Sequence, residues 1–306
     1  MKIGFIMPIS ENPKTNTAPS YPEIRERALK AEAVGLDSIW LPDHLIYRFP
    51  EQPERGIHET MVIWTALAEA TSSIELGTLV ICVPFRNPAV LAKMAVEIDE
   101  ISNGRIILGL GAGWHQPEFD AFGISFDKKV ERFEEALEII VPLVREGTVD
   151  FTGKHYSAPN GAINPSPKRQ IPVLIASKGP RMLDLTAKWA DQWNLAWYGR
   201  YSAFAKDREL MHGALDARGR DRASLKITTG INIHFPDLED IGDAAQNTDK
   251  VLSGTVEEIA DALVEYADNG VDHVILNVMP LTLETIDRLA QIRSLVNERT
   301  AVAAVR

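Results

Sequence analysis

The feature that most constrains the fold is a pair of apolar segments separated by one amphipathic segment. Between Gly77 and Gly123 the chain runs through an apolar strand, a polar loop, a helix, a second apolar strand and a glycine-rich turn. Two strands joined by a single helix run parallel, and strands without polar alternation are buried on both faces. The segment therefore predicts a parallel sheet covered by helices, with its chemistry in the loops that follow the strands.

The same alternation of strand and helix extends along the 306 residues. The predicted strands are Ile3–Met7, Ser38–Leu41, Glu75–Cys82, Arg105–Gly109, Val173–Ile175, Gln192–Ala196, Lys226–His234 and His273–Val278. The predicted helices are Pro22–Val34, Thr60–Thr71, Pro88–Ser102, Lys128–Glu146, Pro180–Ala190, Ala203–Gly219, Thr255–Asn269 and Leu283–Arg299. Eight such units favour a closed (β/α)8 barrel, in one domain spanning residues 1–306, over an open doubly wound sheet.

Long loops are predicted after strands 2, 4 and 7, on the face where a barrel places its active site. We expect the determinants of substrate choice in Ile46–His58, Gln116–Asp127 and Phe235–Gly254. These loops contain no motif that identifies a substrate.

Composition excludes several classes of function. A net charge of -11 argues against nucleic acid or an anionic membrane as a partner. Cys82 is the single cysteine, so we expect neither a disulfide nor a thiolate zinc cluster, in keeping with the cytoplasm. The apolar segment Lys2–Met7 is too short for a signal peptide or a membrane span. The seven histidines form no H-x-H or H-x-x-x-H pair, which argues against a catalytic metal.

Asp43 and His44 end the second predicted strand and are candidate catalytic residues. Histidine exchanges protons near neutral pH, and the adjacent carboxylate would orient or tune the ring. A helix-capping aspartate beside a structural histidine explains the pair equally well. Glu118 and Arg86 are further candidates, as a general acid or base and as an anion partner. An ion pair at the rim is the more frequent role for such charges.

Two loops are candidate ligand sites. Gly109-x-Gly111-x-Gly113 lacks the Rossmann spacing, so it is either a tight turn or a place where backbone approaches a flat ring or phosphate. Ser177-Lys178-Gly179-Pro180 links a strand to a helix, and the helix N-terminus would bind phosphate. An ordinary loop with a solvated lysine is the alternative there.

Aromatic residues are frequent in the predicted rim loops. They are Tyr47, Phe49, Phe85, Trp114, Trp197 and Tyr198. Together they indicate a pocket for a planar or apolar ligand, although some would serve only to cover the barrel core.

These motifs, in this order and at this spacing, resemble the luciferase-like monooxygenase superfamily, which includes enzymes that use FMN or the deazaflavin coenzyme F420. The segments that carry the resemblance are Trp40–Leu45, Gly77–Val80, Pro84–Met94, Ser102–Trp114, Glu118–Phe119, Ala121–Gly123 and Ala190–Asn194. The resemblance is dense from Met1 to Trp197. Within the superfamily the chain is similar to the branch of F420-dependent oxidoreductases.

The resemblance implies a (β/α)8 barrel that holds the cofactor ring at its C-terminal rim. By the resemblance, His44 would exchange a proton with the substrate during hydride transfer. Asp43 and Glu118, which are candidates from the residues themselves, complete the predicted catalytic set. It further implies a non-prolyl cis peptide between Leu79 and Val80, behind the ring. The resemblance places Ser177, Lys178 and Gly179 at the phosphate. From the glycine-rich turn and the rim aromatics we add Gly111, Gly113 and Trp114 as candidate cofactor-binding residues.

Two positions depart from the resemblance. F420-dependent sugar-phosphate and alcohol dehydrogenases carry a carboxylate directly after the last glycine of the strand-four turn, where this chain has Trp114. This difference argues against those substrates. The phosphate loop is often glycine-glycine in the family, whereas Ala176-Ser177-Lys178-Gly179 offers a lysine that suits an anionic tail.

Three functions follow as hypotheses. The leading one is an F420-dependent oxidoreductase that transfers hydride to or from a small organic substrate. The second is an FMN-dependent monooxygenase that is supplied by a separate reductase, in which His44 would assist a peroxyflavin. The third is a non-catalytic flavin or deazaflavin carrier, in which His44 is only structural. The resemblance also implies a homodimer, with the helices after strands two and three as its candidate interface.

Overall fold

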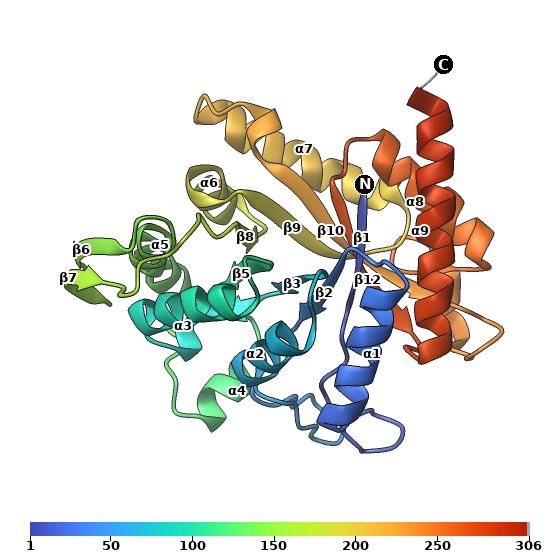
Figure 1. The fold of residues 1–306 in the computed structure, drawn as a ribbon, viewed down its shortest axis with the longest axis horizontal. Coiled ribbons are helices and arrows are strands. Elements are labelled where there is room, and N and C mark those ends of the chain that lie inside the picture. Colours follow the sequence, from blue (N-terminus) through green and yellow to red (C-terminus); the bar gives the residue numbers. More distant parts are fainter. Residues whose placement is uncertain (305–306) are drawn as a thin grey trace. The chain divides into compact units, whose positions relative to one another are not determined.

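Parallel strands alternate with helices throughout residues 1–304, the part of the chain that the computed structural model describes. The strands of the main sheet are β1 (Lys2–Ile6), β2 (Ser38–Leu41), β3 (Glu75–Thr78), β5 (Ile106–Gly111), β8 (Val173–Ala176), β9 (Gln192–Tyr198), β10 (Lys226–His234) and β12 (His273–Met279) (Figure 1). They pair in this order, β9 also pairs with β10, and β12 pairs with β1. This is the strand order of a closed (β/α)8 barrel, which confirms the predicted fold class.

The main helices agree with the predicted ones to within two residues, except at the C-terminal end of the last helix. They are α1 (Tyr21–Ala33), α2 (Thr60–Ala70), α3 (Pro88–Ile101), α5 (Lys129–Glu146), α6 (Pro180–Trp189), α7 (Tyr201–Ala217), α8 (Val256–Asp268) and α9 (Leu283–Ala304). Local signals explain this agreement: Asn87 caps α3 ahead of Pro88, and Gly35 follows α1 at φ +78°. In the described part of the chain, no helix is long and apolar enough to cross a membrane.

The chain divides into two compact units. One unit comprises Met1–Ile6, Glu26–Trp40 and Ser177–Arg306, and the other comprises Met7–Arg25 and Leu41–Ala176. In the first unit, β9, β10, β12, β1 and β2 are parallel neighbours. In the second, β5 lies between β3 and β8, and it also pairs with the short strand β4 (Ile81–Cys82).

The third predicted strand differs from expectation, because it is two strands rather than one. β3 ends at Thr78 and β4 begins at Ile81, and the peptide bond between Leu79 and Val80 is cis, as the family resemblance implied. The Leu79 amide donates to the carbonyl of Leu41 at 2.8 Å instead of continuing the ladder to β5. The strand is therefore interrupted just where the family places its cofactor ring.

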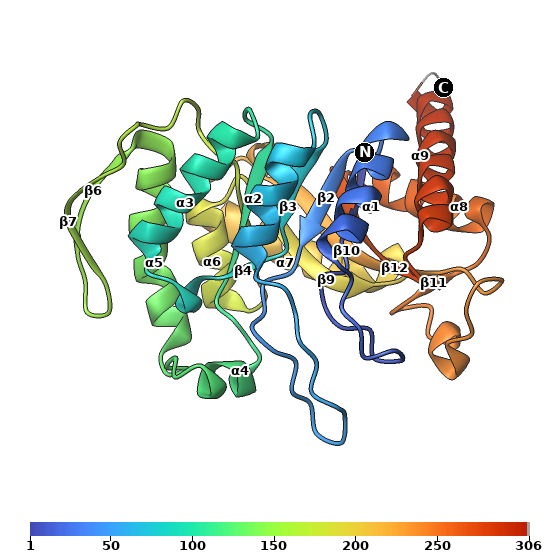
Figure 2. The ribbon, with the colours of Figure 1, turned by 60° about the horizontal axis from the view of Figure 1, so that its bottom comes forward.

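A hairpin that the sequence did not predict follows α5. Strands β6 (Thr148–Thr152) and β7 (Ser157–Ala162) form a separate antiparallel pair, and Figure 2 shows them beside α5. The loop between β2 and α2 is the long excursion at the bottom of that view. The other two predicted long loops contain short elements: α4 (Gln116–Ala121) after β5, and the turn Gly242–Gln246 with β11 (Leu252–Ser253) after β10.

The glycines of β5 are required by close packing against β3 and the residues after it. A Cβ atom on Gly109 would lie 1.8 Å from the carbonyl oxygen of Thr78, and one on Gly111 would lie 2.5 Å from Cγ2 of Val80. Two hydrogen bonds of 2.9 Å also join the Thr78 hydroxyl to the backbone of Gly109. The space beside both glycines is thus occupied by protein atoms.

We expect Gly109→Ala to lower the free energy of unfolding by about 3 kcal/mol, because a backbone carbonyl cannot move aside as a flexible side chain can. Gly213→Ala is the matched control, since no atom lies within 4 Å of its added Cβ inside α7. That change should raise stability by about 0.5–1 kcal/mol. Urea unfolding of both variants tests this contrast, and equal stability of the two would refute it.

His273, at the start of β12, is buried in the first unit and hydrogen-bonded as a neutral ring. The Trp40 indole donates to Ser38 Oγ at 2.7 Å, so the Ser38 hydroxyl donates in turn to Nε2 of His273, also at 2.7 Å. Burial, with a smaller contribution from the charge of Lys2, lowers the pKa of His273 to about 3. The folded state thus resists a proton that the unfolded chain accepts.

Because the pKa of His273 is lower in the folded than in the unfolded state, its contribution to stability is complete above about pH 6.5. This contribution is lost as the pH falls from 6.5 towards 3, and the equilibrium constant for folding falls by roughly tenfold for each pH unit. His273→Gln keeps an acceptor for Ser38 and cannot titrate. Urea unfolding at several pH values tests this. We expect the free energy of unfolding of the variant to fall less steeply with decreasing pH than that of the wild type. Parallel pH dependences of the two proteins would contradict the neutral, buried state of His273.

Candidate active site

His44 and Glu118 meet in the second unit, although 74 positions separate them in the chain. The Nδ1 atom of His44 lies 3.0 and 3.2 Å from the two carboxylate oxygens of Glu118. The Glu118 side chain is 1% exposed, and one of its oxygens also accepts the Leu45 amide at 2.9 Å. Glu118 therefore fixes the ring of His44 and the backbone that carries it. The His44 Nε2 atom makes no hydrogen bond within the described part of the chain.

Asp43 pairs with Arg86 and not with the ring of His44. Its carboxylate accepts two hydrogen bonds from Arg86, at 2.6 and 3.0 Å, and one from the Cys82 amide at 2.9 Å. Arg86 also pairs with Glu59, the residue that caps α2. Asp43 thus holds the end of β2 against the end of β4, and the carboxylate beside the His44 ring is that of Glu118.

The glycine-rich turn after β5 is shaped by protein contacts. Gly113 adopts φ +78°, and a Cβ there would lie 2.6 Å from Phe119 and 2.8 Å from Cys82. Lys129 donates to its carbonyl oxygen at 3.1 Å. This turn carries Trp114 on one side of the cluster and leads into α4, which supplies Glu118.

Aromatic rings surround His44. Tyr47 and Trp114 lie with their ring centroids 4.6 and 5.6 Å from that of the His44 ring, and Phe49 stacks with both of them. Burial raises the pKa of Tyr47 to about 12, so its phenol stays neutral over the physiological range. The rings nearest to His44 are therefore aromatic, and the carboxylate in contact with it is that of Glu118.

His115 supports this cluster and was not selected from the sequence. It is buried, and its Nε2 accepts the Arg48 amide at 3.1 Å, which places the ring hydrogen on Nδ1. Burial lowers its pKa, so the ring is a neutral support for the loop after β2. In the sequence, the one sign of this role is its position between Trp114 and Gln116, where a helix begins.

The predicted phosphate loop lies in the first unit, at the start of α6. Ser177 is buried and its hydroxyl contacts that of Thr186 at 2.7 Å, whereas Lys178 is 67% exposed and 3.5 Å from Asp207. Gly179 adopts φ +85°, and no side chain caps the helix that begins at Pro180. The loop keeps an uncapped helix N-terminus and an exposed lysine, while the serine hydroxyl is occupied within the protein.

His234 is held on both sides. Its Nδ1 contacts the Ser253 hydroxyl at 2.8 Å, and its Nε2 donates to the Glu239 carbonyl at 2.6 Å. It anchors the loop after β10 and leaves no ring nitrogen for a ligand.

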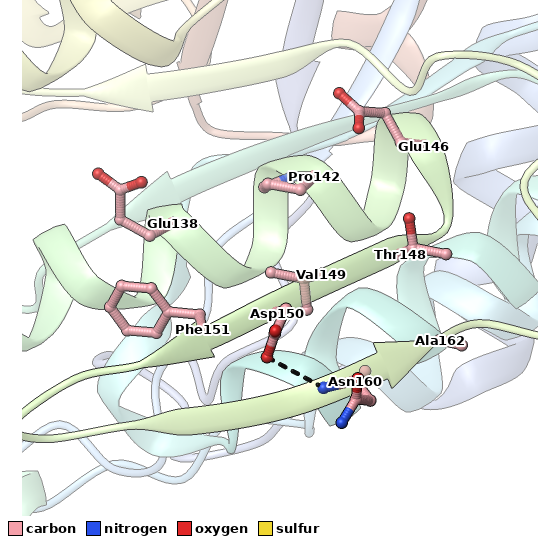
Figure 3. Close-up of a pocket in the computed structure, with 10 residues that line it drawn as sticks. Glu138, Pro142, Glu146, Thr148, Val149, Asp150, Phe151, Asn160 and Ala162 are labelled. Atoms are coloured by element: carbon pink, nitrogen blue, oxygen red, sulfur yellow. Dashed lines mark hydrogen bonds between the residues drawn. The ribbon is translucent and has the colours of Figure 1, made fainter.

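A groove of about 640 Å³ lies between α5 and the hairpin of β6 and β7 (Figure 3). Its charged lining residues are Glu138, Glu146 and Asp150, and the backbone amide of Asn160 donates to Asp150 at 3.3 Å. It shares no residue with the cluster around His44. Among residues 1–304, no group of three or more His, Cys, Asp or Glu side chains is arranged to hold a metal ion.

The comparisons with known proteins identify the family. The family model for luciferase-like monooxygenases matches residues 1–240, and the chain belongs to this family. An F420-dependent glucose-6-phosphate dehydrogenase of Amycolatopsis mediterranei is 36% identical over 173 residues, which are 55% of this chain. A pyrimidine monooxygenase, RutA, of Methylorubrum extorquens is 30% identical over 243 residues, which are 73% of this chain.

These relatives are longer than the matched regions: the matches cover 50% of the first protein and 65% of the second. Among solved structures, an F420-dependent secondary alcohol dehydrogenase in complex with an F420–acetone adduct has a similar fold. Its TM-score is 0.81 at 17% identity, over 96% of this chain and 98% of that one. This likeness concerns the fold.

Proposed function

We propose that this protein is an oxidoreductase that uses coenzyme F420 to transfer hydride to or from a small organic substrate. The observation that carries the proposal is the pair of His44 and Glu118, on loops that follow two strands of a luciferase-like barrel. Its similarity to an F420-dependent dehydrogenase supports the same cofactor. We propose further that residues 1–306 act as one domain.

Taken separately, each unit contains residues that suit one part of a deazaflavin. Leu79 and Val80 are half-buried, which leaves part of their surface available to a flat ring. We assign Gly111 and Gly113 to the border of that ring site, whereas Trp114, predicted at the same border, is left to the substrate. At α6, the uncapped helix N-terminus and Lys178 suit a phosphate, and no atom lies within 4 Å of where a Cβ of Gly179 would be.

When bound, F420 supplies a ring carbon that gives or takes a hydride. The protein supplies the proton that must move with it. Glu118 accepts the hydrogen of His44 Nδ1, which leaves Nε2 to face the substrate as general acid or base. A buried carboxylate also stabilises the ring when it is protonated, so Glu118 supports both directions of proton transfer.

A luciferase-like monooxygenase that uses reduced FMN and dioxygen is the second candidate. The similarity to a pyrimidine monooxygenase favours it. His44 and Glu118 would have the same geometry in such an enzyme, so the site alone does not separate the two cofactors. Such a monooxygenase would depend on a separate reductase. In a non-catalytic carrier, by contrast, neither His44 nor Glu118 would have a role in a reaction.

We propose a cytoplasmic homodimer. Val62 near the start of α2 and Val90 near the start of α3 are 66% and 54% exposed, which is unusual for side chains of this kind. The two helices pack against each other, so their exposed apolar residues are available to a second copy.

Fluorescence titration of the purified protein with F420 and with FMN tests the cofactor. We expect F420 to bind at least tenfold more tightly than FMN. Lys178→Ala should weaken F420 binding by about tenfold, because it removes the charge next to the helix N-terminus. Lys168→Ala, which removes a similarly exposed lysine paired with Glu100, should leave affinity unchanged. Tight FMN binding without F420 binding would reverse the choice of cofactor.

His44→Asn should lower kcat by about 10²- to 10⁴-fold on any alcohol, aldehyde or ketone that the wild type converts, with cofactor affinity unchanged. Glu118→Gln should lower kcat less, because an amide still orients the ring but cannot stabilise its charge. His155→Asn is the control and should leave kcat unchanged. His155 lies between β6 and β7, away from the site, and its Nε2 atom is 3.4 Å from the carboxylate of Glu131 in α5. Unchanged kcat in His44→Asn would favour the carrier.

A further inference from the structure

Three aromatic residues beside His44 form a continuous surface that we call the aromatic wall: Tyr47, Phe49 and Trp114. The Tyr47 and Phe49 rings are stacked, with 6.1 Å between their centroids and 16° between their planes. The rings of Phe49 and Trp114 are 6.2 Å apart at 25°. Two different loops thus contribute three nearly parallel rings to one surface.

Trp114 presents much of its indole to solvent. It is 59% exposed, whereas Trp40, Trp64 and Trp193 are buried completely. Leaving so large an apolar side chain in water is costly unless a ligand covers it. The turn that carries it is held by Gly113 and Lys129, so the exposure results from a fixed backbone.

The charges near the aromatic wall are already engaged. Arg48 pairs with Glu54 at 2.5 Å, Arg55 lies over the Tyr47 ring at 5.1 Å, and Lys129 lies over the Phe126 ring at 4.4 Å. Glu118 is bound to His44 and the Leu45 amide. A phosphorylated or carboxylated substrate would find no unengaged cation among these groups, whereas a flat neutral ring would find a complementary surface.

We propose that the aromatic wall binds a neutral, planar ring of the substrate by stacking, beside His44. Trp114 is then a specificity-determining residue, because its exposed indole supplies the open face of the aromatic wall. The inference rests on the proposed function in one respect: it takes His44 as the group that exchanges a proton with the substrate. The aromatic wall itself consists of contacts within the second unit.

The cofactor ring is also planar, and it is the rival occupant. Tyr47 and Phe49 lie in the loop after β2, where the predicted determinants of substrate choice are. The proposed ring site is assigned instead to the backbone at Leu79 and Val80. We therefore assign the exposed face of Trp114 to the substrate, and we expect the aromatic wall to bind its ligand while F420 is bound.

Two bicyclic alcohols with the same skeleton provide the test. 2-Naphthol is planar and aromatic, and decahydro-2-naphthol is saturated and not planar. Their affinities for the F420-loaded protein are measured by isothermal titration calorimetry, with glucose 6-phosphate as an anionic probe. We expect 2-naphthol to bind at least tenfold more tightly than its saturated counterpart, and glucose 6-phosphate not to bind.

Three variants locate the effect. Trp114→Leu should abolish the preference for 2-naphthol, and Trp114→Phe should retain most of it, because phenylalanine keeps an aromatic face. Phe122→Leu is the matched control: Phe122 is 54% exposed at the end of α4 and lies outside the aromatic wall. Its preference should equal that of the wild type. Circular dichroism of each variant establishes that it is folded.

Equal affinity for the two bicyclic alcohols, tighter binding of glucose 6-phosphate, or an unchanged preference in Trp114→Leu would each overturn the inference. So would competition between 2-naphthol and F420, because the aromatic wall would then belong to the cofactor. Failure of F420 to bind would refute the proposed function instead. In that event the same titrations with the cofactor-free protein still decide whether the aromatic wall prefers a planar ring.

Discussion

The buried carboxylate of Glu118 is the interaction on which the candidate site depends. It joins the loop after β2 to the helix after β5 by contacts to His44 and to the Leu45 amide. The Glu118 carboxylate is 1% exposed, so its oxygens depend on their hydrogen-bond partners. Movement of either loop would break these hydrogen bonds and leave a buried polar group unpaired, which is costly. The same contacts that stabilise the charge therefore fix the orientation of His44.

A second buried carboxylate keeps these loops at the ends of their strands. Asp43 binds Arg86 and the Cys82 amide, and Gly109 and Gly111 admit the backbone of Thr78 and the side chain of Val80 at distances that no larger residue would allow. The ion pair of Asp43 and the close packing of the two glycines therefore act on the same stretch of chain, from Thr78 to Cys82. The irregular segment around Leu79 and Val80 is thus held from both sides.

The sequence predicted what local chemistry determines. Proline at the start of α3 and glycine after α1 marked helix ends, and the run from Arg105 to Gly109 was recognisable as a buried strand, which the structure extends to Gly111. The hairpin of β6 and β7 was missed because Pro159 and Gly161 interrupt its pattern and only Ala158 is buried in β7. Glu118 was a candidate from the sequence, but its pairing with His44 was out of reach, because nothing in the sequence links two residues that are 74 positions apart. Long-range pairing depends on how the strands assemble, which local propensity does not encode.

The turn that carries Trp114 is supported separately from the pair of His44 and Glu118. Gly113 adopts a left-handed conformation, a Cβ there would meet Phe119 and Cys82, and Lys129 donates to its carbonyl oxygen. The indole of Trp114 contacts the rings of Phe49 and His44 and is still largely exposed, whereas the His44 ring is oriented by its hydrogen bonds to Glu118. Under the proposed function, the residues that move the proton and the ring that meets the substrate are therefore neighbours with different supports, so a change at residue 114 would alter specificity while the chemistry is retained.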